Sequence, residues 1–209
     1  MRPGFRYLIT AAAGVAIGLA AAVQTVRAGA LGSGVAIGPW RSGADFGTAD
    51  ASARTRAIVA LSGLLALPAR EARYYTAAAD DAGAPLDGRC TYLVSGGPLP
   101  SRWWSLTLYD DRGYLAGAGP YSVESGTLAR EEAERARSVR PPAVIALPRP
   151  VPGQWSVAVL PRPTRLTSDA LPTAGLGRFQ LTLRLYLPVD GGRGDPPRAV
   201  LPAIRRERC

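Results

Sequence analysis

Two pairs of adjacent aspartates are the residues whose spacing most readily suggests chemistry. Asp80–Asp81 and Asp110–Asp111 are each followed closely by a glycine. Neighbouring carboxylates can act as acid and base, or bind calcium through their oxygens. Asp ahead of Gly is also what tight turns select, because the aspartate side chain accepts hydrogen bonds from the local backbone. We favour the turn interpretation at both places, and predict no catalytic residue and no metal ligand.

A second set of residues could bind a ligand by stacking. Trp103 and Tyr109 belong to the run "WWSLTLYD", and Arg184 and Tyr186 belong to "RFQLTLRLYLP". An exposed aromatic pair can stack on a sugar ring, although packing in the core or beneath a loop is the commoner role of such side chains. The side chain of Arg184 alternates with apolar residues in its strand, so it either reaches solvent or pairs with a buried acid. We favour the structural role and keep these four residues as the candidate ligand-binding set.

The composition excludes several classes of function. The chain has no histidine, which removes Ser-His-Asp and Cys-His catalysis, His-ligated zinc and the usual proton shuttle. Its 25 basic residues are all arginine and give a net charge of +9, but they are scattered apart from three near residue 209. Proteins that bind nucleic acid gather such charge on a face or stripe. We therefore expect no nucleic-acid partner and no cofactor, and we favour a non-catalytic protein.

The two cysteines, Cys90 and Cys209, suggest a disulfide. An even number of cysteines in an oxidising compartment is typical of a structural bond. This bond would close a loop of about 119 residues, for which the chain-entropy model gives roughly 4–5 kcal/mol. Spacing alone does not prove pairing, so two free thiols are the alternative.

The elements that must position these residues are mostly strands. Period-two alternation begins at residue 71 and returns in about seven short runs separated by Pro and Gly, which indicates an antiparallel sandwich or barrel. The runs at 143–148, 154–161 and 178–188 are three of these strand candidates. Two of the strand candidates have one clearly apolar face. In the candidate around residues 103–109 this face consists of Trp104, Leu106 and Leu108, and in the candidate at 178–188 it consists of Phe179, Leu181, Leu183, Leu185 and Leu187.

Helical patterns are fewer. Ala57, Ile58, Leu61, Leu64 and Leu65 recur at helical spacing, and Pro68 follows them. Asp50 or Thr48 is the expected cap of this helix, because both side chains accept hydrogen bonds from the first turn. The charged segment 129–140 is a helical insert or a loop.

The N-terminal segment is long and apolar. An uncharged stretch covers residues 7–26 and follows Arg2 and Arg6. Twenty helical residues span roughly 30 Å, the thickness of a bilayer core. The small residues ending at Ala30 also fit a signal-peptide cleavage site. We prefer an uncleaved anchor because the run exceeds the usual signal core, and the positive-inside rule then places its N-terminal end in the cytoplasm.

The body of the chain resembles a known family. The segment from "REARYYTAAADD" to "SRWWSLTLYDDRGYL", then "RFQLTLRLYLP" and "LPAIRRERC", is similar to the bacterial domain-of-unknown-function family 1214 over about residues 40–209. The similarity is strongest at residues 103–110 and 183–186. The resemblance implies a jelly-roll-like β-sandwich, often beside a second domain of unknown function, and shorter members carry an N-terminal membrane segment instead. It implies no activity.

One departure from the family pattern concerns a possible pocket. The family tends towards Asn-Trp-Leu-Pro before the last long strand, whereas this chain has Asp169 and Ala170 ahead of Leu-Pro. If that tryptophan lines a pocket in relatives, the pocket is altered here.

These observations predict a mainly β fold, an antiparallel jelly-roll-like β-sandwich with one N-terminal transmembrane helix and one or two short helices. We expect a transmembrane anchor or signal segment at 1–30, a tether at 31–47 and the sandwich at 48–209. The expected location is the inner membrane with the C-terminal domain in the periplasm; secretion to the periplasm after cleavage is the alternative. The expected function is a non-catalytic module that binds a glycan, lipid or envelope protein. An enzyme that acts on an envelope or imported small molecule through carboxylate or tyrosine chemistry is the alternative.

Overall fold

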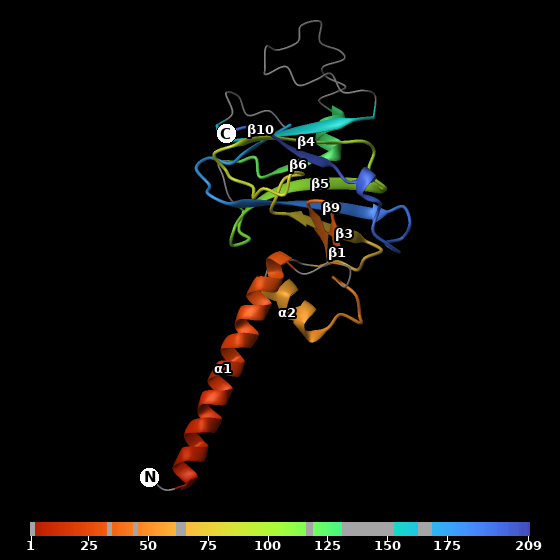
Figure 1. Ribbon diagram of the computed structural model, residues 1–209. Helices are drawn as coiled ribbons and strands as arrows, with labels where there is room; N and C mark the ends of the chain where they lie inside the picture. The colour runs from red at the N-terminus through yellow and green to blue at the C-terminus, as the bar shows by residue number, and fades with distance from the viewer. Residues whose placement is uncertain are drawn as a thin grey trace, which may run out of the picture.

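The protein is a two-sheet β-sandwich preceded by a long helix (Figure 1). The computed structural model describes residues 3–32, 35–43, 46–61, 66–115, 119–130, 153–162 and 169–209. In these ranges one sheet has six strands in the order β1-β2-β3-β9-β5-β6, and the other has four in the order β10-β4-β7-β8. The strands are β1 (Val35–Ile37), β2 (Trp40–Ser42), β3 (Ala72–Ala77), β4 (Thr91–Gly96), β5 (Ser101–Asp110), β6 (Ser122–Glu124), β7 (Trp155–Leu160), β8 (Ala170–Pro172), β9 (Phe179–Pro188) and β10 (Ala203–Arg208).

The predicted sandwich is confirmed, with one exception to its antiparallel pairing. Every strand pair is antiparallel except β7–β8, which is parallel. The strand candidate at 154–161 forms β7, whereas the candidate at 143–148 and most of the charged segment 129–140 lie outside the described residues. The jelly-roll assignment within this class of fold stays a prediction.

The central strands β5 and β9 behave as their alternation predicts. They pair along nearly their whole length, with Trp104 opposite Leu185 and Leu106 opposite Leu183. Their apolar faces are buried in a single core with residues of the four-stranded sheet. Leu187 is an exception, since it is 49% exposed and has a positive φ of 49°. Its backbone leaves the extended conformation, so the predicted apolar face ends at Leu185.

Helix α2 (Ala53–Leu61) starts later than expected. Its first turn is capped by Ser52, whose hydroxyl oxygen accepts the backbone N–H of Thr55 at 3.1 Å. The predicted caps Asp50 and Thr48 are therefore wrong: they precede the helix by more than one residue. Ile58 is buried, as its spacing predicts.

Helix α1 (Pro3–Gly32) extends away from the sandwich (Figure 1). Its stretch from Arg6 to Thr25 is long and apolar enough to cross a membrane or to be a signal sequence, and none of it is buried in the fold. Near the end of this stretch Arg54 of α2 donates a hydrogen bond of 3.4 Å to the carbonyl of Thr25.

Part of the predicted tether belongs to the sheet. Residues 35–42 form the β1–β2 hairpin, in which Trp40 is fully buried. Its indole N–H donates to the carbonyl of Pro202 at 2.8 Å, so the segment 31–47 contributes to the core. The two strands have only three residues each and the segment is rich in glycine, so no alternating pattern indicated them in the sequence.

The segment that follows β9 is tied to the sheet by a buried ion pair. Arg73 of β3 is bonded to Asp195, and the two side chains are only 8% and 18% exposed. Asp195 also accepts hydrogen bonds from the hydroxyls of Ser42 and Tyr75, and Arg73 donates to the carbonyl of Gly192 at 2.8 Å. Burial, together with nearby Asp195, raises the pKa of Tyr75 well above the ordinary tyrosine value, so Tyr75 stays a hydrogen-bond donor.

Candidate functional site

The outer face of the six-stranded sheet, the face turned away from the core, carries all four predicted ligand-binding residues. Trp103 of β5 lies directly opposite Tyr186 of β9 in the register. Their ring centroids are 4.6 Å apart at an interplanar angle of 42°. We call these two residues the aromatic pair. Both rings are half-buried, which leaves part of each ring open to a ligand.

Arg184 precedes Tyr186 by two residues on the same face, and its side chain reaches along the sheet away from the aromatic pair. Its guanidinium donates to the hydroxyl of Thr107 at 3.0 Å and to the hydroxyl of Tyr109 at 2.6 Å. It also lies 5.5 Å from the centre of the Tyr109 ring. In the described part of the chain both bonded partners are neutral, so neither sequence-based alternative, solvent alone or a buried acid, describes this arginine. It is a half-buried cation held in place by two hydroxyls.

Trp103 is also partly covered by its own chain. Residues 125–130 are helical, and a side-chain carbon placed on Gly126 would lie 3.9 Å from the indole nitrogen of Trp103. This contact supports the expected packing against a neighbouring segment. The other predicted alternative, ring stacking on a ligand, stays open for the exposed part of the ring.

A cleft of about 940 Å³ opens at the end of the outer face where β9 begins. Gln180 of β9 is opposite Tyr109 in the register, which places the cleft beside Tyr109. Three strands and two turns contribute the charged and polar side chains of the lining: Arg41, Thr76, Asp80, Asp81, Asp111, Arg178 and Gln180. Sequence reasoning identified only the aspartates among them.

The first aspartate pair is engaged by the protein itself. One carboxylate oxygen of Asp80 accepts the backbone N–H groups of Ala82 and Ala84 at 3.1 and 2.9 Å, and the other lies 3.0 Å from Arg206. Asp81 is bonded to Arg198 and accepts the N–H of Ile204 at 2.8 Å. The turn role is confirmed for Asp80, while Asp81 connects this turn to the strand β10.

The two aspartates of the second pair also have different roles. Asp110 accepts the N–H groups of Arg112 and Tyr114 at 2.9 and 2.8 Å, as a turn-forming aspartate should. Asp111 is exposed at the wall of the cleft. Among the described residues no cluster of three His, Cys, Asp or Glu side chains could hold a metal ion.

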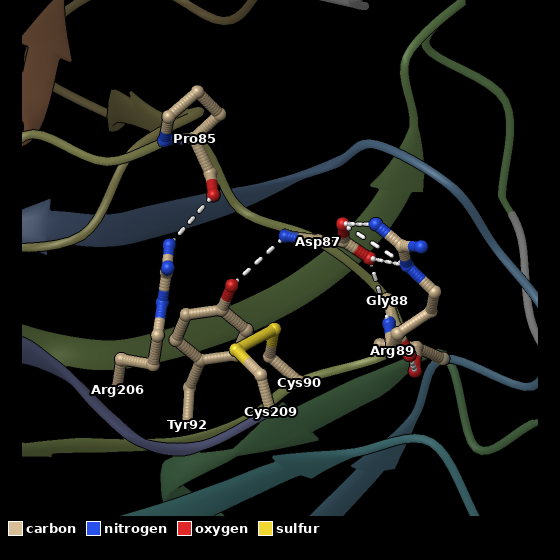
Figure 2. Close-up of polar contacts among 9 residues, drawn as sticks. Pro85, Asp87, Gly88, Arg89, Cys90, Tyr92, Arg206 and Cys209 are labelled. Carbon is tan, nitrogen blue, oxygen red and sulfur yellow. Dashed lines mark hydrogen bonds and ion pairs between the residues drawn. A yellow bond between two sulfur atoms is a disulfide. The ribbon is translucent and has the colours of Figure 1, made fainter.

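A disulfide closes the loop between β3 and β4 against the C-terminal strand. Figure 2 shows Cys90 bonded to Cys209, across a sequence separation of 119 residues. Beside this bond Arg206 donates to the carbonyl of Pro85 at 2.9 Å, and its guanidinium lies 5.5 Å from the centre of the Tyr92 ring. The disulfide and Arg206 hold the loop in place from two sides.

An exposed ion pair accompanies the disulfide (Figure 2). Arg89 and Asp87 are 2.6 Å apart, and the hydrogen bonds from Arg89 lower the pKa of Asp87 to about 2. The backbone N–H of Asp87 donates to the hydroxyl of Tyr92 at 2.9 Å. Because the Arg89 side chain is exposed, this pair adds little to stability.

The cleft arginines were missed because their neighbours are distant in the sequence. Arg41 comes from a strand of three residues, and Arg178 immediately precedes β9. The available signal was the alternation of β9, which places Gln180 on the same face as Arg184 and Tyr186. No pattern in the sequence indicated that β2 lies near this end of β9.

The solved structures that match this chain include two bacterial proteins. The VPA0106 protein from Vibrio parahaemolyticus matches with a TM-score of 0.50 and 20% identity, over 75% of this chain and 36% of that chain. An uncharacterised protein from Burkholderia cenocepacia matches with a TM-score of 0.37 and 19% identity, over 66% of this chain and 30% of that chain. The first supports the fold alone, and the chain spans about a third of the length of these proteins.

No curated protein matches this chain. The sequence pattern of the family described as "Protein of unknown function (DUF1214)" matches residues 71–190. These residues include β3, β5 and β9, and with them the whole candidate ligand-binding set. Because the match covers more than half of the sequence, the chain belongs to the DUF1214 family, as its motifs at 103–110 and 183–186 predicted.

Proposed function

We propose that this protein is a non-catalytic binding module of the cell envelope, held in the inner membrane by α1, with its sandwich in the periplasm. The exposed apolar surface of α1 supports the anchor, because it is long enough to span a bilayer and is not buried in the fold. The Cys90–Cys209 bond supports the compartment, because structural disulfides form and persist outside the reducing cytosol.

The ligand that this face fits best is a glycan. The observation that carries this proposal is the half-buried aromatic pair with Arg184 on the same face. Aromatic rings offer a flat apolar surface to the C–H face of a sugar, and a guanidinium donates to its oxygens. A lipid partner would require a broad apolar surface, whereas the half-buried Arg184 and Tyr109 make this part of the face polar.

The enzymatic alternative is supported by the cleft, where three aspartates and two arginines converge. Acid–base catalysis requires a carboxylate that is free to gain and lose a proton at the substrate. Asp80 and Asp81 are instead bonded to backbone N–H groups and to Arg206 and Arg198. Asp111 is then the single carboxylate of the described lining without such bonds, and one carboxylate does not supply both acid and base, so we prefer the binding function over carboxylate chemistry.

Binding is tested with Trp103→Ala in the full chain, solubilised in detergent and applied to an array of bacterial envelope oligosaccharides. We expect the wild type to retain at least one of them and Trp103→Ala to bind it about tenfold more weakly, because the stacking surface is lost. Tyr121→Ala is the matched control, since Tyr121 is an exposed aromatic outside the aromatic pair. Equal binding by wild type and Trp103→Ala would contradict the proposal.

The anchor is tested by protease treatment of spheroplasts that express the full chain. We expect external protease to digest the sandwich, and the intact chain to remain in the membrane pellet after alkaline extraction. A soluble chain that begins near residue 31 would show that α1 is cleaved off, and would contradict the proposed anchor. Full protection from external protease would contradict the periplasmic location.

A further inference from the structure

Arg184 lacks a negatively charged partner in the described part of the protein. Its two hydrogen-bond acceptors are the hydroxyls of Thr107 and Tyr109. Glu124 shares the outer face, but it belongs to the edge strand β6, where it pairs with Ser105, and Ser105 in turn pairs with Arg184. Two strand spacings, about 10 Å, therefore separate the backbones of Glu124 and Arg184.

A guanidinium that is partly removed from water is stabilised by an anion more than by neutral hydroxyls. Charge-assisted hydrogen bonds are roughly twice as strong as neutral ones, and the planar guanidinium has five N–H donors, of which Thr107 and Tyr109 take two. The two hydroxyls hold the group in one orientation, which reduces the entropy lost when a ligand binds. The site is therefore preorganised for a planar or tetrahedral anion.

We propose that the ligand is an acidic oligosaccharide whose carboxylate or phosphate group binds Arg184 while a more distant sugar ring of the same molecule stacks on the aromatic pair. This inference rests on the proposed glycan-binding function and adds the charge of the ligand to it. Arg184 and Tyr186 are two residues apart on one face of β9, so their Cα atoms lie about 6.6 Å apart. The guanidinium of Arg184, however, is bonded to Thr107 and Tyr109, which follow Trp103 by four and six residues in β5, so roughly 13 Å of strand separates it from the aromatic pair. An oligosaccharide, and not a single sugar residue, is therefore needed to span both groups.

The cleft offers a competing position for the acid. Arg178 lies there, six residues before Arg184, and thus roughly 20 Å away along the strand direction. The charges of Asp80 and Asp81 are matched by Arg206 and Arg198, but Asp111 remains at the wall of the cleft. Arg41 and Arg178 outnumber Asp111 in this lining, so the cleft also attracts an anion, and the Arg178→Gln variant decides between the two positions. We prefer Arg184 because two hydroxyls already hold its guanidinium in one orientation.

The test uses pairs of matched probes with the full chain in detergent: oligogalacturonates of two to six residues against their methyl esters, and mannose 6-phosphate oligosaccharides against the unphosphorylated forms. Isothermal titration calorimetry is expected to show that an acid binds at least tenfold more tightly than its neutral counterpart. The carboxylate and phosphate series show which anion is preferred.

Three variants test which arginine binds the acidic group of the ligand. Arg184→Gln is expected to remove the preference for the acid, with acid and neutral probe binding equally. Tyr109→Phe keeps the charge and removes one hydrogen bond to Arg184, so it should reduce the preference by about two- to threefold. Arg178→Gln is the matched control, because it removes an exposed arginine of the cleft and should leave the preference unchanged.

The outcomes separate this inference from the proposed function. Neutral probes that bind as tightly as acids, with binding lost in Trp103→Ala, would overturn the acidic ligand and leave the glycan-binding function standing. A preference that disappears in Arg178→Gln instead of Arg184→Gln would move the acid to the cleft and overturn the inference. The absence of binding by any of these probes would overturn the acidic ligand, and the absence of retention on the oligosaccharide array as well would contradict the glycan-binding function.

Discussion

Replacing Asp195 by alanine is expected to lower the free energy of unfolding by about 3–5 kcal/mol, the usual cost of breaking a buried ion pair. Arg73 would then remain charged beneath the segment that follows β9, and its side chain is only 8% exposed. Ser42 and Tyr75 would lose their shared acceptor at the same time. Urea denaturation of the full chain in detergent, followed by tryptophan fluorescence, measures the effect.

Two further variants show whether the buried charge is the cause. Glu71→Ala breaks the Arg70–Glu71 pair, whose side chains are 71% and 43% exposed, and should cost less than about 1 kcal/mol. The double variant Arg73→Met with Asp195→Leu removes both charges and should recover most of the stability lost in Asp195→Ala. A double variant as unstable as Asp195→Ala would show that packing, and not the unpaired charge, dominates.

Replacing Cys209 by alanine is expected to lower the free energy of unfolding by up to about 4–5 kcal/mol, the chain-entropy value for a loop of 119 residues. The unfolded chain gains freedom when this loop opens, while β10 keeps its ladder with β4 through Ile204 and Arg205. Engineered disulfides often give less than this value. Denaturation with and without reductant measures the difference on the same protein.

The control for the disulfide is the double variant Cys90→Ala with Cys209→Ala. Because either single change already opens the loop, the double variant should be nearly as stable as Cys209→Ala. Reductant should destabilise the wild type alone. A wild type that reductant leaves unchanged would contradict a stabilising disulfide.

The parts of the fold that follow from local pattern were predictable. The alternation of 103–109 and 179–185 assigns both faces of β5 and β9, because a strand places successive side chains on opposite sides. It therefore predicts that Trp104 enters the core, where it packs on Trp155 with ring centroids 4.3 Å apart. Asp80 and Asp110 were identifiable as turn residues from the glycines that follow them.

The parts that depend on long-range pairing were not predictable. Nothing near Asp195 in the sequence indicates that it meets Arg73, which lies 122 residues earlier. Arg184 was expected to find an acid or solvent, but it lies opposite Ser105 and its long side chain reaches along β5 to the hydroxyls of Thr107 and Tyr109 instead. The cleft likewise depends on the pairing of β2 with β3 and of β3 with β9, which no local pattern encodes.

The connection between the β3–β4 loop and β10 also sets an order of events during synthesis. Asp81 cannot receive the N–H of Ile204 until 123 further residues have been made, which takes about 6–25 s at 5–20 residues per second. Through that interval Asp80 and Asp81 lack Arg206 and Arg198, and Cys90 is a free thiol without its partner. The loop is thus the last part of the sandwich to close, and an exported chain would close it only on the far side of the membrane.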